Sequence, residues 1–445
     1  MIEGFYGPPW SLAEREELLA ALPGWGLDTY LYGPKDDLHH RARWREPYAA
    51  AEAAGLASLI AGCAVRGVRF FYALGPGLDL RFGDDADRER LRARLAQLLD
   101  LGGRHFALLF DDIPDRMRDA DRERFGSFAA AQADVANGLL AFVRGRAPDA
   151  RLLFCPTPYC GRMTAAGLGG AGYLETLGRA LHPDFGVFWT GPEIISREIT
   201  VAHVREVASR LRRKPVIWDN LHADDYDGRR VFLGPYAGRP PELRAEVAGI
   251  LTNPNTEHAV NHVALRTLGD WLHAGEAWEP RAAYLRALGE WAPRFATVAG
   301  EAGAEDLTLF CDCFYLPHED GHGARALTAA FDRLVGTDPA MWTVAEVEAF
   351  RGPATRLRDF CTGLAALRDR ALFAALWRRV WELREELDLL LAWVRQKQAD
   401  PRGLARSDFH LPGTYRGGFV ARLQGLLEPR ADGSFEPAAE KENRR

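Results

Sequence analysis

The sequence contains no run of about eighteen apolar residues, the length that a helix needs to cross a membrane. Its first six residues lack the basic start and apolar stretch of a secretory signal, so we expect a cytoplasmic protein. No block of lysine and arginine with interleaved aromatic residues occurs, and the formal net charge is only −6. Neither a membrane nor nucleic acid is therefore an expected partner.

Cysteine is scarce and irregularly placed. The six cysteines are Cys63, Cys155, Cys160, Cys311, Cys313 and Cys361. This pattern fits a reduced protein better than a disulfide framework. Cys311 and Cys313, followed by His318 and His322, leave a zinc cluster open as an alternative, but a turn at 317–321 explains these polar residues without a metal. We expect neither a metal nor a cofactor.

The apolar content is sufficient for a large core. Hydrophobic residues make up 47% and charged residues 27% of the 445 positions, as in ordinary globular enzymes. A chain of this length is expected to form a barrel-sized domain with a smaller partner. Eight short runs rich in β-branched, aromatic and aliphatic residues predict buried parallel strands at 2–7, 29–35, 69–75, 105–112, 151–159, 185–192, 215–220 and 249–255.

Segments of helical period alternate with these runs. They lie at 12–22, 49–65, 87–101, 125–143, 173–181, 201–211, 242–247 and 259–272. Eight strand-then-helix units predict an α/β fold, a (β/α)8 TIM barrel, with an open doubly wound sheet as the alternative. Amphipathic helical patterns follow, so we predict a catalytic barrel at 1–275, an all-α helical domain at 276–428 and a polar, mobile tail at 429–445. Apolar stripes on these helices leave open a homodimer through the helical domain.

Adjacent carboxylates end the fourth predicted strand. The buried run 106–110 leads directly into Asp111 and Asp112, and in a barrel the chemistry belongs at the strand ends. Repulsion and lost hydration are expected to raise the proton affinity of at least one of the two. Neighbouring strand residues point to opposite faces, so the two should address different atoms. From the pair alone, a helix N-cap or a metal site remain alternatives.

Seven ordered motifs resemble one known family. They are Gly4 to Gly7, Tyr30 to Asp37, Trp44 to Glu46, Phe106 to Ile113, Trp189 to Pro192, Trp218 to Asn220 and Leu251 to Asn255. Together they resemble glycoside hydrolase family 84, the O-GlcNAcases, in the manner of a bacterial homologue of the animal enzymes. The helical segment after residue 280 also resembles the domain that follows the barrel in this family. The acetyltransferase-like domain of animal members has no counterpart in this sequence.

The resemblance implies a retaining exo-β-N-acetylglucosaminidase that removes O-linked N-acetylglucosamine from serine and threonine, or from other β-glycosides. Catalysis would be assisted by the substrate's own acetamido group through an oxazoline, an exception to the two-carboxylate scheme. Asp111 would orient the acetamido group, and Asp112 would act as general acid and then base. The Tyr159 hydroxyl would donate a hydrogen bond to the acetamido or oxazoline oxygen. The implied substrate-binding residues are Gly4, Lys35, Trp218, Asn220, Asp225, Asn253 and Tyr226.

Two positions depart from the family pattern, and the substrate leaves alternatives. Pro158 and Met163 stand where an acidic and an aromatic residue are usual, in a loop expected to meet the aglycone. The partner implied is a glycopeptide or glycoside that carries N-acetylglucosamine. A β-hexosaminidase of the same mechanism acting on glycans or peptidoglycan fragments, and a catalytically silent sugar-binding protein, are the alternatives.

Overall fold

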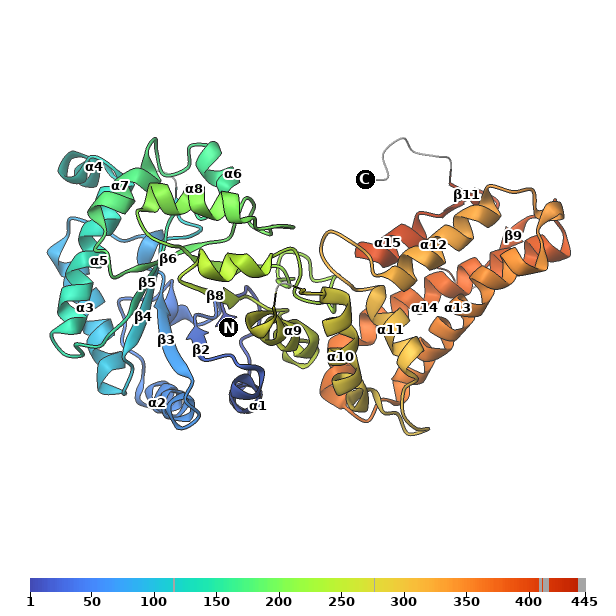
Figure 1. Cartoon of the computed structure of the whole chain (residues 1–445), viewed down its shortest axis with the longest axis horizontal. Helices are drawn as coiled ribbons and strands as arrows, with labels where there is room; N and C mark the ends of the chain where they lie inside the picture. Colours follow the sequence, from blue (N-terminus) through green and yellow to red (C-terminus); the bar gives the residue numbers. More distant parts are fainter. Residues whose placement is uncertain (115–116, 276, 408–409, 411–415, 439–445) are drawn as a thin grey trace. The chain divides into compact units, whose positions relative to one another are not determined.

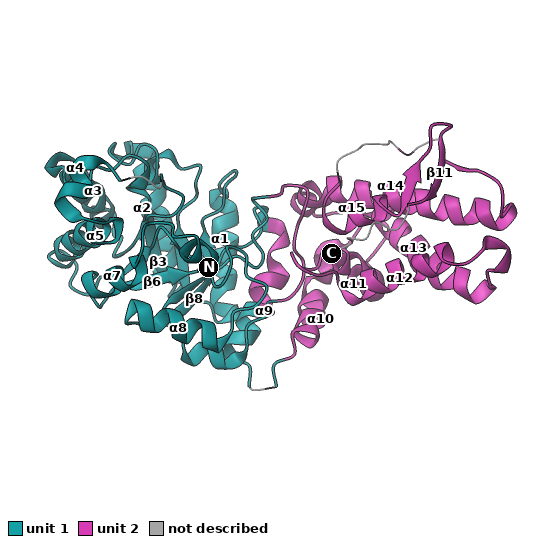
Figure 2. Cartoon of the chain, turned by 90° about the horizontal axis from the view of Figure 1, so that it is seen from above, with its two compact units in different colours: residues 1–226, 236–258, 268–278 teal, residues 227–235, 259–267, 279–445 magenta. Residues whose placement is uncertain are grey.

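The computed structural model describes residues 1–114, 117–275, 277–407, 410 and 416–438. These residues form two compact units, shown in different colours in Figure 2. The barrel unit comprises residues 1–226, 236–258 and 268–278, and the helical unit comprises 227–235, 259–267 and 279–445. The change at 278 lies close to the predicted boundary at 275, but the chain also contributes two earlier segments to the helical unit.

The barrel unit is built on eight parallel strands that pair in the order of the sequence. They are β1 (Ile2–Glu3), β2 (Thr29–Tyr32), β3 (Arg69–Leu74), β4 (His105–Leu109), β5 (Leu152–Cys155), β6 (Gly186–Trp189), β7 (Val216–Asp219) and β8 (Gly249–Thr252). Near the seam between β8 and β1, Trp10 Nε1 donates to the Thr256 carbonyl oxygen at 2.7 Å. The predicted (β/α)8 barrel is confirmed, and helices surround the strands in Figure 1.

The helices between the strands follow the predicted order with two additions. They are α1 (Leu12–Ala21), α2 (Ala50–Val65), α3 (Asp85–Asp100), α4 (Asp119–Phe125), α5 (Phe128–Arg144), α6 (Gly161–Ala165), α7 (Tyr173–Ala180), α8 (Val201–Leu211) and α9 (His262–His273). The sequence missed α4 and α6, which are too short to show a period. The helix predicted at 242–247 is instead the 3₁₀ turn Pro241–Ala245, preceded by Pro240.

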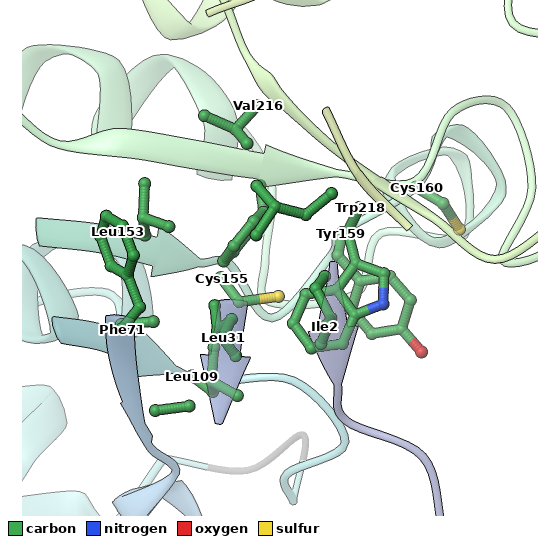
Figure 3. Packing of buried hydrophobic residues seen from close by; sticks show 14 residues of the cluster. Ile2, Leu31, Phe71, Leu109, Leu153, Cys155, Tyr159, Cys160, Val216 and Trp218 are labelled. Carbon is green, nitrogen blue, oxygen red and sulfur yellow. The ribbon is translucent and has the colours of Figure 1, made fainter. Parts of the chain in front are cut away.

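Apolar side chains fill the barrel interior. On β3, β4 and β5 these are alternate residues, as strand geometry requires when one face points inward. Several labelled side chains of this cluster are shown from close by in Figure 3. The cluster comprises Ile2, Leu31, Phe71, Ala73, Ala107, Leu109, Leu153, Cys155, Tyr159, Cys160, Phe188, Val216, Trp218 and Leu251. Tyr159 and Trp218 therefore join the packed interior to the strand ends where polar groups begin.

The helical unit confirms the predicted helices after residue 280. They are α10 (Pro280–Trp291), α11 (Ala304–Asp312), α12 (His322–Val335), α13 (Val344–Gly363), α14 (Arg370–Ala399) and α15 (Gly418–Gln424). No helix in the described part of the chain is long and apolar enough to span a membrane.

A small antiparallel sheet accompanies these helices and was not predicted. It consists of β9 (Ala405–Arg406), β11 (Ser434–Pro437) and β10 (Leu427–Pro429), with β11 in the middle. Secondary structure therefore continues into the segment predicted as a polar tail from 429, where Ser434 and Phe435 are buried. Residues 439–445 of the predicted tail lie outside the described residues.

Candidate active site

Asp111 lies beyond the end of β4 on the inward-facing side of the strand. It continues the alternation of Ala107 and Leu109, and its side chain is 11% exposed. Lys35 Nζ, from the end of β2, lies 2.8 Å from Asp111 Oδ2. Burial alone would raise the pKa of the Asp111 carboxyl, but the Lys35 ammonium lowers it below its ordinary value. The raised proton affinity expected from adjacent carboxylates therefore does not fall on Asp111.

Asp112 turns out of the strand. Its φ of +49° is one of only two positive values for non-glycine residues in the described chain, and this left-handed conformation costs an L residue roughly 1–2 kcal/mol. Alternation would have directed Asp112 away from the barrel axis. Instead, Asp112 Oδ1 accepts from the Tyr159 hydroxyl at 3.1 Å and Oδ2 accepts from the Tyr6 hydroxyl at 3.0 Å. The expectation that the two aspartates address different atoms agrees with these separate partners.

The two tyrosines at Asp112 are hydrogen-bond donors over the whole physiological range. Burial raises the pKa of Tyr159 well above its ordinary value, and the Asp112 and Asp111 charges raise it further. Burial and the Asp112 charge likewise raise the pKa of Tyr6 to about 12, against a smaller opposing effect of Arg41. Both hydroxyls therefore keep their protons and can present them to Asp112.

A chain of polar groups joins the ends of β7 and β8. Trp218 Nε1 donates to Asn220 Oδ1 at 3.0 Å, and Asn253 Nδ2 donates to the same oxygen at 3.1 Å. Asn253 Oδ1 is buried without a hydrogen-bond partner among the described residues. Gly4 packs so closely that an added Cβ would lie 2.9 Å from the Trp218 ring. These contacts leave the Asn253 Oδ1 acceptor without a partner among the described residues, in the same cluster as the Trp218 ring.

The β7 end is fixed by a buried ion pair behind the site. Arg239 Nε and Nη2 donate to Asp219 Oδ2 and Oδ1 at 2.8 and 2.7 Å, and both side chains are fully buried. Burial opposes ionisation of Asp219, but Arg239 lowers the pKa of its carboxyl below the ordinary value. Because Asp219 lies between Trp218 and Asn220, this pair holds both flanking side chains in position.

Asp225 contacts Tyr6, the residue whose hydroxyl donates to Asp112. Its Oδ2 accepts from the Tyr6 backbone N–H at 2.8 Å. Burial raises the pKa of Asp225, against opposing effects of that N–H and of Lys35. The neighbouring Tyr226 is 50% exposed. The loop after Tyr159 carries Met163 on α6, which packs against the barrel interior cluster.

Sequence reasoning missed two residues of this constellation. Tyr6 lies within the 4–7 motif but had no role assigned, and Arg41 had no signal at all. Arg41 lies within hydrogen-bonding distance of both Tyr6 and Asp112. For metal binding, the described residues contain no group of three or more histidine, cysteine or acidic side chains placed to hold an ion. Cys311 and Cys313 are buried in the helical unit.

Three comparisons with known proteins agree with this geometry. Residues 1–312 match the β-N-acetylglucosaminidase family. The chain is 46% identical over 271 residues to the protein O-GlcNAcases of Rattus norvegicus and Mus musculus. That match covers 61% of this chain and 29% of each relative, so the chain spans under a third of their length. An O-GlcNAc hydrolase variant from Thermobaculum terrenum superposes with a TM-score of 0.79 at 27% identity, covering 90% of this chain and 87% of that one.

Proposed function

Because this chain belongs to the β-N-acetylglucosaminidase family, which it matches over residues 1–312, we propose that it is a retaining exo-β-N-acetylglucosaminidase. Its substrates are β-linked N-acetylglucosamine residues on serine and threonine of glycopeptides. The observation that carries the proposal is that the two adjacent carboxylates have different hydrogen-bond partners and can therefore take different roles. Asp111 is held by Lys35 and Asp112 by two tyrosine hydroxyls.

In the first step, the substrate's acetamido carbonyl oxygen attacks the anomeric carbon as the glycosidic C–O bond breaks. Asp112 gives its proton to the leaving oxygen, and the Asp111 carboxylate accepts a hydrogen bond from the acetamido N–H and balances the positive charge of the oxazolinium ring. Lys35 supports this role because it favours the ionised form of Asp111. Tethering the nucleophile to the sugar supplies up to roughly 7–11 kcal/mol in well-oriented systems.

In the second step, Asp112 takes a proton from water as the water oxygen attacks the anomeric carbon and the oxazoline ring opens. Two successive inversions leave the β configuration unchanged. Tyr159, which donates to Asp112, turns its hydroxyl to the acetamido oxygen of the substrate. Trp218 walls the acetamido pocket, and Asn220, Asp225, Asn253, Lys35, Tyr226 and the backbone at Gly4 bind the sugar hydroxyls.

The deciding experiment compares nitrophenyl β-glycosides with and without the 2-acetamido group and follows the anomeric proton of the product by NMR. The proposal expects turnover only with the acetamido group and first formation of the β anomer. Equal cleavage of the plain glucoside, or first formation of the α anomer, would refute it. A modified serine peptide then tests the aglycone, and binding without turnover of any of these compounds would favour a silent sugar-binding protein.

Two further parts of the proposal concern location and assembly. We place the protein in the cytoplasm, since its six cysteines are all unpaired, buried thiols, the state that a reducing compartment maintains. We also propose a homodimer through the helical unit, where Trp377 and Trp381 lie one turn apart on α14 and are each 53% exposed. Sedimentation of the wild type and of Trp381→Glu tests this assembly, and a wild-type monomer at micromolar concentration would overturn it.

A further inference from the structure

The strained turn at Asp112 has an external support. Arg41 Nη2 donates to the Asp112 carbonyl oxygen at 2.7 Å, and Arg41 Nη1 donates to the Tyr6 hydroxyl oxygen at 3.2 Å. That hydroxyl in turn donates to Asp112 Oδ2 at 3.0 Å. One guanidinium group therefore contacts the backbone of Asp112 directly and its carboxylate through one intermediary.

The contact with Tyr6 is directional. Because Arg41 can only donate, its N–H group occupies a lone pair of the Tyr6 oxygen and leaves the phenolic proton to point elsewhere. Asp112 Oδ2 is the acceptor within reach. Arg41 thus supports the backbone of Asp112 at its carbonyl oxygen and, through Tyr6, one carboxylate oxygen, while Tyr159 donates to the other.

Arg41 is itself held by the short segment that precedes it, the 3₁₀ turn η2 (Leu38–His40). Asp37 caps this turn by accepting from the His39 N–H at 2.9 Å. The buried His40 is tied to β3 and its end, since its Nδ1 lies 2.7 Å from the Ala73 carbonyl oxygen and its own carbonyl accepts from the Gly75 N–H at 2.9 Å. The guanidinium therefore projects from a fixed base rather than from a loose loop.

We infer that Arg41 is a positioning residue for Asp112, holding the acid in the orientation from which it protonates the leaving oxygen. This inference rests on the proposed function. Its consequence falls mainly on proton delivery, because Arg41 hydrogen-bonds Asp112 and Tyr6. On Asp111 it acts only through its charge, which adds to the larger effect of Lys35 in lowering the pKa of that carboxyl. Loss of Arg41 should therefore matter most when the leaving group needs the proton most.

The test measures kcat/KM for a series of aryl β-N-acetylglucosaminides with increasingly basic leaving groups. For Arg41→Ala we expect a loss of a few-fold on activated phenols and roughly 100-fold on the most basic ones. Arg41→Lys should recover part of this loss by keeping one donor at the Asp112 carbonyl. Arg43→Ala is the matched control, because Arg43 lies two positions after Arg41, is half-exposed and pairs with Glu46.

Two results would overturn the inference. One is an equal loss on every leaving group, with Arg41→Lys no better than Arg41→Ala, which would indicate a general structural role. The other is a crystal structure of Arg41→Ala in which the φ and carboxylate of Asp112 are unchanged. The second readout needs no activity, so it decides the positioning role even if the wild type cleaves no N-acetylglucosaminide and the proposed function fails.

Discussion

Lys35 Nζ lies 2.8 Å from Asp111 Oδ2, with the two side chains 4% and 11% exposed. The ion pair is nearly inaccessible to solvent. Burial raises the pKa of the Asp111 carboxyl, but Lys35, with smaller contributions from Arg41 and a backbone N–H, lowers it below its ordinary value. The pair therefore keeps Asp111 anionic at pH values where an isolated buried carboxyl would take up a proton. An anion at this position suits the charge that an oxazolinium ring develops.

Replacing Lys35 by methionine should move the acidic limb of the kcat/KM profile to higher pH. Lys35 lowers the pKa of Asp111, so its removal raises that pKa, and the active carboxylate is lost at a higher pH as the solution is acidified. Arg41, which also lowers this pKa, remains in the variant and limits the shift. The pH profile on an activated aryl glycoside measures the effect, and an unmoved acidic limb would separate Lys35 from the ionisation of Asp111.

Asp112→Asn should slow substrates with basic leaving groups by roughly 10²–10⁴-fold. Substrates with activated phenols as leaving groups should lose much less rate. The reason is that an activated phenolate departs without a proton, while an alkoxide such as that of serine does not. Steady-state rates over a leaving-group series measure the difference. Identical slowing of all substrates would contradict the role of Asp112 as acid.

Asp111→Asn should instead reduce the rate on all leaving groups alike, because the acetamido group attacks in every case. It should also weaken binding of an oxazoline or thiazoline mimic, which resembles the intermediate more than the substrate. Calorimetric titration of the inhibitor into the wild type and variant gives the comparison. If inhibitor affinity is the same for both, Asp111 does not contact the acetamido group.

Asp225 should reject sugars that differ at the fourth carbon. A site built to hydrogen-bond a hydroxyl disfavours an analogue that cannot make the bond, here by at least about 100-fold. We expect the wild type to prefer gluco- over galacto-configured aryl glycosides and Asp225→Ala to lose most of this preference. The ratio of kcat/KM values is the measurement, and a ratio unchanged by the substitution would place the selecting contact elsewhere.

Arg239→Met should destabilise the barrel unit by about 3–5 kcal/mol, because it leaves the fully buried Asp219 without its partner. Arg205→Met, which removes a surface ion pair with Glu246, should cost far less, because solvent screens that pair. Chemical denaturation of both variants supplies the comparison. Since Arg239 lowers the pKa of Asp219, the ion pair's contribution is fully present above the ordinary carboxyl pKa and is lost as pH falls from there through the lower pKa of the folded state. Equal free energies of unfolding for the two variants would contradict this assignment.

The sequence predicted the barrel well because its strands are buried on both faces and read as apolar runs. It placed strand ends too late, as at β4, where the prediction reached residue 112 and the strand ends at Leu109. Apolar content alone does not show that Asp112 adopts a φ of +49°. The strands β9 to β11 have only two to four residues each, too few for an alternating pattern.

The position of Asp111 could be predicted because its motif follows a buried strand, and Tyr159 lies four residues beyond the end of β5. The roles assigned to both residues stay predictions. The candidate site was not predictable where the role depends on a contact between distant positions. Arg41 and the Asp112 carbonyl are 71 positions apart, and no local pattern links them. Lys35 was predicted as a ligand of sugar hydroxyls, and its pairing with Asp111 likewise required the three-dimensional arrangement.

Residues 227–235 lie in the connection between β7 and β8, the seventh crossover of the barrel, but belong to the helical unit. Arg379 on α14 donates to the carbonyl oxygens of Gly228 and Arg230, 151 and 149 positions earlier. During synthesis this stretch leaves the ribosome long before Arg379 is made, so the seventh crossover stays unfinished until nearly the whole chain has emerged. A protein truncated after Trp278 would keep every barrel strand yet lack the partners of 227–235, and it should be more easily cut there by proteases.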